Sequence, residues 1–130
     1  MERTWLSLDD ARASTVEALC ETIVPGSSRT GPAVYIDAKL AGLPEPARAE
    51  LIGAIDALAD VAEGGAEALA PRTRSPEFFM VRALATEAFY SDFVAPGAEG
   101  PGAYEEIDFR FPLASRIEKD WSYLGVSPPA

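Results

Sequence analysis

The strongest constraint on the fold of this chain is the spacing of its apolar residues. They recur at intervals of three and four, and proline and glycine interrupt the pattern. One such stripe contains Val16, Leu19, Cys20 and Ile23, and it ends at a Pro-Gly pair. This spacing places the side chains on one face of an α-helix, and proline and glycine end helices. The pattern predicts a mainly α-helical protein, folded as a small bundle of about five helices.

The same reasoning divides the chain into helices joined by short connectors. Ser7 and Ser75 are the predicted N-caps of the first and fourth helices, because a serine side chain accepts a hydrogen bond from the first helical turn. The length suits one domain over residues 1–130, with an ordered core over about 7–125. The expected helices run from Ser7 to the Pro25-Gly26 break, from Pro32 to Gly42, from Ala47 to Glu63, from Ser75 to Tyr90, and from Leu113 to Leu124.

The segment between the fourth and fifth predicted helices has a different composition. Residues 91–106 (SDFVAPGAEGPGAYEE) are rich in glycine and proline, which is typical of a long loop. After this loop, Ile107, Phe109 and Phe111 alternate with Asp108 and Arg110, and this period of two indicates a short strand. A lone strand has unpaired backbone groups, so we expect it to pair with another chain.

The acidic composition disfavours several classes of function. The net charge is −10 and the pI is about 4.4, so phosphate backbones and anionic lipid surfaces repel the chain. No apolar run approaches the ~20 residues of a membrane span, so we expect no membrane insertion. The first ten residues do not resemble a secretory signal, and a cytoplasmic location is expected. A signal already removed, or export together with a partner, is the alternative.

Few side chains in the sequence suit catalysis or metal binding. The chain has no histidine, which is the usual general base and zinc ligand. Its one cysteine, Cys20, lies on the apolar stripe beside Glu21, so a buried core residue is favoured over an activated nucleophile. For the clustered carboxylates, charged surface is favoured over a metal site. The sequence therefore predicts no catalytic, metal-binding or cofactor-binding residue. The carboxylates considered are Asp56, Asp60, Glu63, Glu105, Glu106 and Asp108.

Aromatic side chains gather on both sides of the glycine-rich loop. Aromatic residues are enriched at protein interfaces, and there are more of them here than a small helical core is expected to hide. For Phe89 and Trp121, packing inside the core is the favoured alternative. The predicted partner-binding surface consists of Phe89, Tyr90, Phe93, Tyr104, Ile107, Phe109, Phe111, Trp121 and Tyr123.

Three short segments together resemble a known family. They are ALCETIVPG at 18–26, TEAFYSD at 86–92 and KDWSYLG at 119–125. In this order they are similar to the small subunits of the gluconate 2-dehydrogenase subunit 3 family, and the resemblance covers roughly residues 14–125. The chain departs from the family in two ways. Its first residues contain no twin-arginine pair, and VAPGAEGPG stands where a Gly-Gly-Asn segment usually follows Phe-Tyr-Ser-Asp.

The resemblance implies a small helical subunit that is not itself an enzyme. Such a subunit binds and stabilises a large FAD-dependent oxidoreductase of the glucose-methanol-choline type, which oxidises a sugar, an alcohol or a glycoside. The FAD belongs to that large subunit, and this chain holds no cofactor. Two alternatives stay open. One is a transient folding or export chaperone of the flavoprotein. The other, less favoured, is a free-standing helical enzyme that uses carboxylates.

Overall fold

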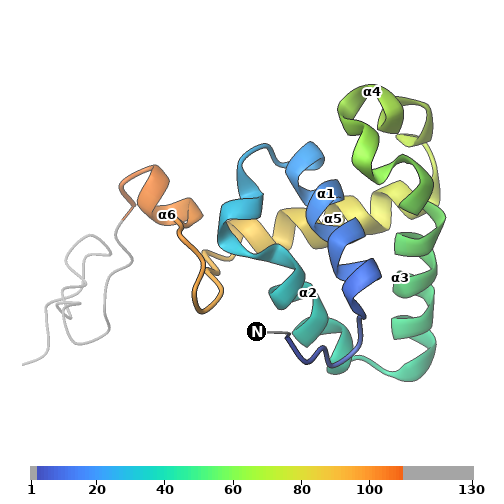
Figure 1. The fold of residues 1–130 in the computed structure, drawn as a ribbon, viewed down its shortest axis with the longest axis horizontal. Helices are drawn as coiled ribbons and strands as arrows, with labels where there is room; N and C mark the ends of the chain where they lie inside the picture. The colour runs from blue at the N-terminus through green and yellow to red at the C-terminus, as the bar shows by residue number, and fades with distance from the viewer. Residues whose placement is uncertain (1–2, 110–130) are drawn as a thin grey trace, which may run out of the picture.

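The computed structural model describes residues 3–109, which form six α-helices joined by short 3₁₀ helices and loops (Figure 1). These residues contain no strand, and the protein is mainly helical, as the spacing of its apolar residues predicts. The α-helices are α1 (Asp10–Ile23), α2 (Pro32–Ala41), α3 (Glu45–Ala57), α4 (Gly65–Leu69), α5 (Pro76–Tyr90) and α6 (Ala103–Glu106). The 3₁₀ helices are η1 (Ser27–Thr30), η2 (Ala59–Gly64) and η3 (Ala70–Arg72).

Helix α1 is the centre of the fold and contacts α2, α3, α4 and α5. Figure 1 shows α5 crossing α1 and α3 running along one side of the molecule. The predicted stripe of α1 packs into the core, where Val16, Leu19 and Cys20 are buried. In the part of the chain that the structure describes, none of the helices has the length and apolar character that a membrane crossing needs. The largest fully buried apolar side chains are Leu19, Ile36, Leu40, Ile55 and Leu58.

Helix α1 begins later than predicted, and its N-cap is Asp9 rather than Ser7. The Asp9 side chain accepts a hydrogen bond from the Arg12 backbone N at 2.8 Å, which satisfies a donor of the first turn. Ser7 instead belongs to the preceding segment, where its backbone N–H binds a carboxylate of α2. The predicted cap of α5 is confirmed, since the Ser75 hydroxyl accepts a hydrogen bond from the Phe78 N at 3.1 Å.

Helix α3 ends at Ala57, so the predicted extension to Glu63 is wrong. The chain continues through Leu58, which is buried as expected, into the 3₁₀ helix η2. Arg72 supplies the physical reason. Its Nη1 donates to the Ala57 carbonyl O at 3.1 Å, and its Nη2 pairs with Asp60 at 2.7 Å. An arginine from later in the chain therefore satisfies the end of the helix, which the local sequence does not reveal.

The predicted strand over 107–111 is wrong for those of its residues that the structure describes. Ile107 and Asp108 form a turn after α6, and Asp108 has a left-handed φ of +54°. The Phe109 N donates to the Tyr104 carbonyl O at 2.8 Å. This backbone hydrogen bond closes a turn and is not the pairing of one strand with another. The rest of the predicted strand, and the predicted helix over 113–124, lie outside the described residues.

A carboxylate on α2 holds the N-terminal segment against the bundle. Asp37 is 5% exposed, and its two carboxylate oxygens accept hydrogen bonds from the backbone N of Leu6, Ser7 and Leu8. The three distances lie between 2.7 and 2.9 Å. Hydrogen bonds to an ionised acceptor are stronger than neutral ones, so Asp37 anchors the approach to α1 and places Leu8 in the core.

We expect Asp37→Ala to lower the free energy of unfolding by about 3 kcal/mol, because three backbone donors lose a charged acceptor and the Leu8 N–H stays buried. Chemical denaturation followed by circular dichroism measures this loss. Glu45→Ala, which removes an exposed ion pair with Arg48, is the control, with an expected loss below about 1 kcal/mol. A loss at Asp37 no larger than at Glu45 would contradict the anchoring role.

Candidate partner-binding surface

Cys20 is a buried core residue, as the sequence favours, with 1% of its surface exposed. Burial raises the pKa of its thiol to about 12, and the nearby carboxylates of Glu17 and Glu21 add to the rise. Since the thiolate is the reactive form, a thiol with this pKa is a poor nucleophile near neutral pH. The CETIVPG segment is a structural helix end.

The segment that joins α1 to α2, residues 24–31, is called the corner below. The Ser27 hydroxyl, which is fully buried, donates to the Cys20 carbonyl O at 2.9 Å. Glu21 accepts a hydrogen bond from the Ser28 hydroxyl at 2.7 Å and another from the Gly26 N–H, and these bonds lower the pKa of Glu21. The polar groups at the end of α1 are thus satisfied locally, which fixes the path of the chain through the corner.

The corner also binds the segment that follows α5, residues 91–109, which we call the arm. The Ala95 N donates to the Thr30 carbonyl O at 2.9 Å, and the Gly100 N donates to the Arg29 carbonyl O at 3.2 Å. The two segments also lie close together at Gly31, where φ is +69° and an added Cβ atom would lie 2.8 Å from the Ala95 Cβ. Glycine adopts this conformation without strain, and its lack of a side chain leaves room for the arm.

The Arg29 side chain adds a second set of contacts between the corner and the arm. Its Nε donates to the Pro101 carbonyl O at 2.9 Å, and its Nη2 forms an ion pair with Glu106 in α6. The guanidinium carbon lies 5.2 Å from the centre of the Phe89 ring, within the range of a cation–π interaction. One arginine therefore connects the corner, α5 and α6.

Asp92 orients α6 within the arm. It lies two residues beyond the end of α5 in a left-handed conformation, with φ of +65°. Its Oδ1 accepts a hydrogen bond from the Tyr104 backbone N at 3.0 Å. The N-cap of α6 is Gly102, which has no side chain to accept a hydrogen bond from the first turn. Asp92, ten residues earlier in the chain, supplies that acceptor.

The described members of the predicted partner-binding surface have different degrees of exposure. Tyr90, Ile107 and Phe109 are 60%, 72% and 48% exposed, and all three belong to the arm or to the end of α5. Phe89 is buried, in agreement with the alternative stated for that residue. The other described members, Phe93 and Tyr104, are half-buried, and Phe111, Trp121 and Tyr123 lie outside the described residues.

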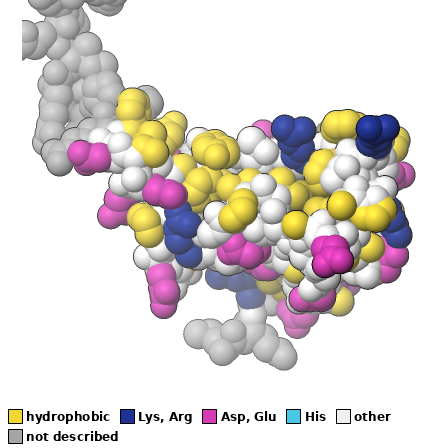
Figure 2. All heavy atoms as spheres, turned by 90° about the horizontal axis from the view of Figure 1, so that it is seen from above, with side chains coloured by type: hydrophobic (Ala, Val, Ile, Leu, Met, Phe, Trp, Pro, Cys, Tyr) yellow, Lys and Arg dark blue, Asp and Glu magenta, His cyan; other side chains and the backbone are white. Residues whose placement is uncertain are grey.

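Between the end of α5 and α6 lies a hollow of about 180 Å³, which we call the arm hollow. The Tyr104 ring meets the Phe109 ring edge-on beside it, with centres 5.1 Å apart. Figure 2 shows hydrophobic side chains on the face seen there, next to the grey residues, with carboxylates among them. Six residues line the arm hollow: Phe89, Tyr90, Ala103, Tyr104, Glu106 and Ile107.

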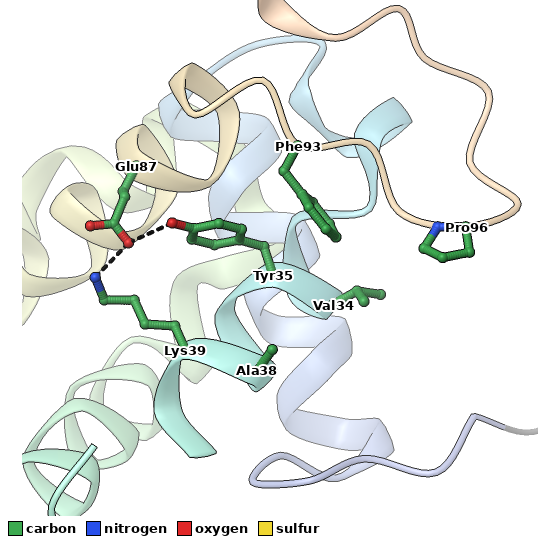
Figure 3. Close-up of a pocket in the computed structure, with 7 residues that line it drawn as sticks. All are labelled: Val34, Tyr35, Ala38, Lys39, Glu87, Phe93 and Pro96. Atoms are coloured by element: carbon green, nitrogen blue, oxygen red, sulfur yellow. Dashed lines mark hydrogen bonds and ion pairs between the residues drawn. The ribbon is translucent and has the colours of Figure 1, made fainter. Parts of the chain in front are cut away.

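A larger groove, of about 660 Å³, lies between α2, α5 and the start of the arm (Figure 3). Phe93 packs on Tyr35 at its edge, with ring centres 5.4 Å apart. The sequence alone does not reveal this groove. Tyr35 and Lys39 share a face of α2 at a spacing of four, but nothing local shows that α5 lies opposite them. The lining residues are Val34, Tyr35, Ala38, Lys39, Glu87, Phe93 and Pro96.

Glu87 is the polar centre of this groove. Its Oε2 accepts hydrogen bonds from the Lys39 Nζ at 2.5 Å and from the Tyr35 hydroxyl at 2.9 Å (Figure 3). The hydrogen bond from Lys39 lowers the pKa of Glu87, whereas burial and the Glu87 carboxylate raise the pKa of Tyr35. Both shifts move the pKa of the group further from neutral pH. General acid–base catalysis is favoured by a pKa near the working pH.

The carboxylates considered as metal ligands in the third predicted helix form ion pairs or face solvent. Asp56 binds the Arg12 guanidinium at 2.9 and 3.0 Å, which lowers the pKa of Asp56. Asp60 pairs with Arg72, and both Asp60 and Glu63 lie in η2 rather than in α3. Over residues 3–109, no group of three or more acidic or cysteine side chains could hold a metal ion.

Comparison with known proteins does not assign the chain to a family. No protein-family model matches it, and no curated protein or solved structure matches it either. The candidate surface is therefore identified from its geometry alone. The class of partner is suggested only by the resemblance of the short segments named above.

We expect Arg29→Ala to loosen the arm, because the arm loses the hydrogen bond at Pro101 and the ion pair at Glu106. Chymotrypsin cleavage after the aromatic residues of the arm is the measurement. A loss of roughly 1.5 kcal/mol for hydrogen bonds to a charged group would raise the cleavage rate about tenfold. Arg48→Ala, which breaks an ion pair within α3, is the control. Equal cleavage rates in wild type and Arg29→Ala would contradict this role.

The lowered pKa of Glu87 predicts a pH-dependent contribution to stability. The contribution is present above the unfolded glutamate pKa of about 4.3 and is lost as the pH falls through the lower folded pKa. Because the Glu87 side chain is 42% exposed, we expect less than about 1 kcal/mol. An NMR titration of the Glu87 carboxyl carbon measures the folded pKa, and Lys39→Met should raise it. A titration midpoint at or above that of an unstructured glutamate would contradict the assigned network.

Proposed function

We propose that this chain is a noncatalytic subunit that binds and stabilises a larger protein through the arm. The observation that carries the proposal is the exposure of Ile107 and Phe109 on the arm, which the corner holds in place, beside the exposed Tyr90 at the end of α5. A few large aromatic and apolar side chains on a fixed support supply most of the binding energy at many interfaces. Exposed apolar patches of this kind mark interaction sites more often than the scattered apolar residues of an ordinary surface do.

The partner that we propose is a large FAD-dependent oxidoreductase of the glucose-methanol-choline type, which oxidises a sugar, an alcohol or a glycoside. The resemblance of residues 18–26, 86–92 and 119–125 to accessory subunits of such enzymes supports this choice. The first two segments contribute to the corner and to the start of the arm, next to the candidate surface. In this proposal the FAD belongs to the partner, and the complex is cytoplasmic.

The chemistry of the described side chains supports a binding role over a catalytic one. Burial raises the pKa of Cys20 to about 12, so the thiol stays protonated. In the α2–α5 groove, the pKa of Glu87 is lowered and the pKa of Tyr35 is raised. A catalytic acid or base is commonly shifted toward the working pH, and these groups are shifted away from it.

The test is affinity purification of the tagged full chain from its native host, followed by an absorbance spectrum of the eluate. We expect a yellow complex with a much larger protein, because the partner carries the flavin. Tyr90→Gln and Ile107→Asn should each weaken the complex by about 2 kcal/mol, the size typical of an interface hot spot. Phe79→Gln is the matched control, since Phe79 is 55% exposed at the opposite end of α5.

A folded, colourless chain that purifies without a larger protein would contradict the proposal. Recovery of the complex in full amount with Tyr90→Gln and Ile107→Asn would contradict the assignment of the arm as the interface. A flavoprotein that co-purifies only while it is being synthesised would favour the chaperone alternative over a permanent subunit.

A further inference from the structure

A second hollow, which we call the α4 hollow, lies near the start of α5, far along that helix from the arm. It has a volume of about 260 Å³ and lies between the end of α1, α4 and the first turns of α5. Its apolar lining continues into the core, because Leu69 is buried and both Ile23 and Phe78 pack against core residues. The lining residues are Thr22, Ile23, Ala66, Leu69, Thr73, Phe78 and Arg82.

Two arginines at the α4 hollow have no carboxylate partner among residues 3–109. Arg82 lines the hollow, and Arg74 directly follows Thr73, which also lines it. Both arginines are exposed, and neither forms an ion pair with another described residue. The basic residues that do pair with a described carboxylate are Arg12, Arg29, Lys39, Arg48 and Arg72.

The hydroxyl groups of the α4 hollow are already used within the chain. The Thr22 hydroxyl donates to the Ala18 carbonyl O at 3.1 Å, and the Thr73 hydroxyl donates to the Ala70 carbonyl O at 3.0 Å. Among the side chains that line the hollow, Arg82 is therefore the one whose donors no described residue binds. A ligand in the hollow would meet an apolar wall and a guanidinium group.

The charge of this region is opposite to that of the whole chain. Residues 70–86 contain three arginines and one carboxylate, Glu77, whereas the chain has a net charge of −10. Figure 2 shows Lys and Arg side chains next to hydrophobic ones at the end of the molecule away from the arm. Such a region attracts an anionic group over about a Debye length, while the net charge of the chain repels nucleic acids and anionic lipid surfaces. A short acidic segment is thus the favoured partner.

The size of the α4 hollow indicates which part of that segment it holds. Small-molecule sites usually have volumes of about 300–1,000 Å³, and this hollow is smaller. It has room for one large apolar side chain against Ile23, Leu69 and Phe78. Beside it, the guanidinium groups of Arg74 and Arg82 can each bind a carboxylate through two parallel hydrogen bonds. These features together fit a peptide in which an apolar side chain lies between carboxylates.

We infer that the α4 hollow binds an acidic segment of a partner protein, with one large apolar side chain flanked by carboxylates. The apolar side chain enters the hollow beside Phe78, and the carboxylates pair with Arg74 and Arg82. The inference does not depend on the proposed flavoprotein, because it concerns a separate surface. Phe78 and Tyr90 are about 18 Å apart along α5 at 1.5 Å per residue.

The test is an NMR titration of the ¹⁵N-labelled full chain with the peptide acetyl-Asp-Glu-Phe-Asp-Glu-amide. We expect a Kd below about 1 mM at low salt, with chemical-shift changes at the Leu69 and Arg82 amides and none at the Ala95 amide of the arm. Arg82→Gln and Arg74→Gln should each weaken binding about tenfold, because each removes hydrogen bonds between charged groups. Arg48→Gln, which removes the same charge from α3, should leave the Kd unchanged.

Further variants test the shape of the α4 hollow. Ala66→Phe fills the hollow from an exposed lining position and should prevent binding. Ala49→Phe, at an exposed position on α3, should not. The same peptide with alanine in place of phenylalanine should bind about tenfold more weakly, because less apolar surface is buried. Circular dichroism checks that each variant keeps its helical content.

Four results would overturn the inference. They are no binding at millimolar peptide, equal affinities of Arg82→Gln and Arg48→Gln, shifts that map to the arm, and self-association. In the last case the same amides would shift on concentrating the chain without peptide, which would assign the α4 hollow to a second copy. All of these measurements use the chain without a flavoprotein, so their failure is distinct from failure of the proposed function.

Discussion

Helix α1 ends just before the buried Ser27, and the carbonyl groups of its last turn need hydrogen-bond donors there. The corner supplies them within a few residues, through the buried Ser27 hydroxyl and the backbone that follows Cys20. The Glu21 carboxylate accepts hydrogen bonds from the Gly26 N–H and the Ser28 hydroxyl of the corner. Because these local bonds fix the path of the chain, the carbonyl groups of Arg29 and Thr30 point to where the arm can bind them. The position of the arm depends on how α1 is terminated.

This arrangement explains why a glycine- and proline-rich segment without long secondary structure can present a defined surface. The arm docks by two backbone hydrogen bonds and by the contacts of the Arg29 side chain with Pro101 and Glu106. Asp92 then sets the orientation of α6. Tyr90 and Ile107 are thereby held at the arm hollow, although neither is buried. A loop restrained in this way loses less conformational entropy on binding a partner than a free loop would.

The elements that local pattern determines could be predicted, and those that distant contacts determine could not. The stripe of α1 and the Ser75 cap of α5 depend on residues within one or two turns, and both follow from the sequence. The end of α3 is bound by Arg72, and α6, which precedes the turn at Ile107, is bound by the Asp92 carboxylate, so both contacts come from residues distant in the sequence. The α2–α5 groove was missed for the same reason, since Glu87 meets Lys39 only in the folded chain.

The most direct test of this account is native-state hydrogen exchange at the Ala95 amide, which donates to Thr30 in the corner. If the corner holds the arm as part of the folded body, this amide should exchange only through an opening that costs several kcal/mol, close to the value for buried amides of α1. Exchange at the rate of an unstructured chain, while α1 stays protected, would show that the arm is free. Such a result would contradict the central claim that α1, the corner and the arm form one structural unit.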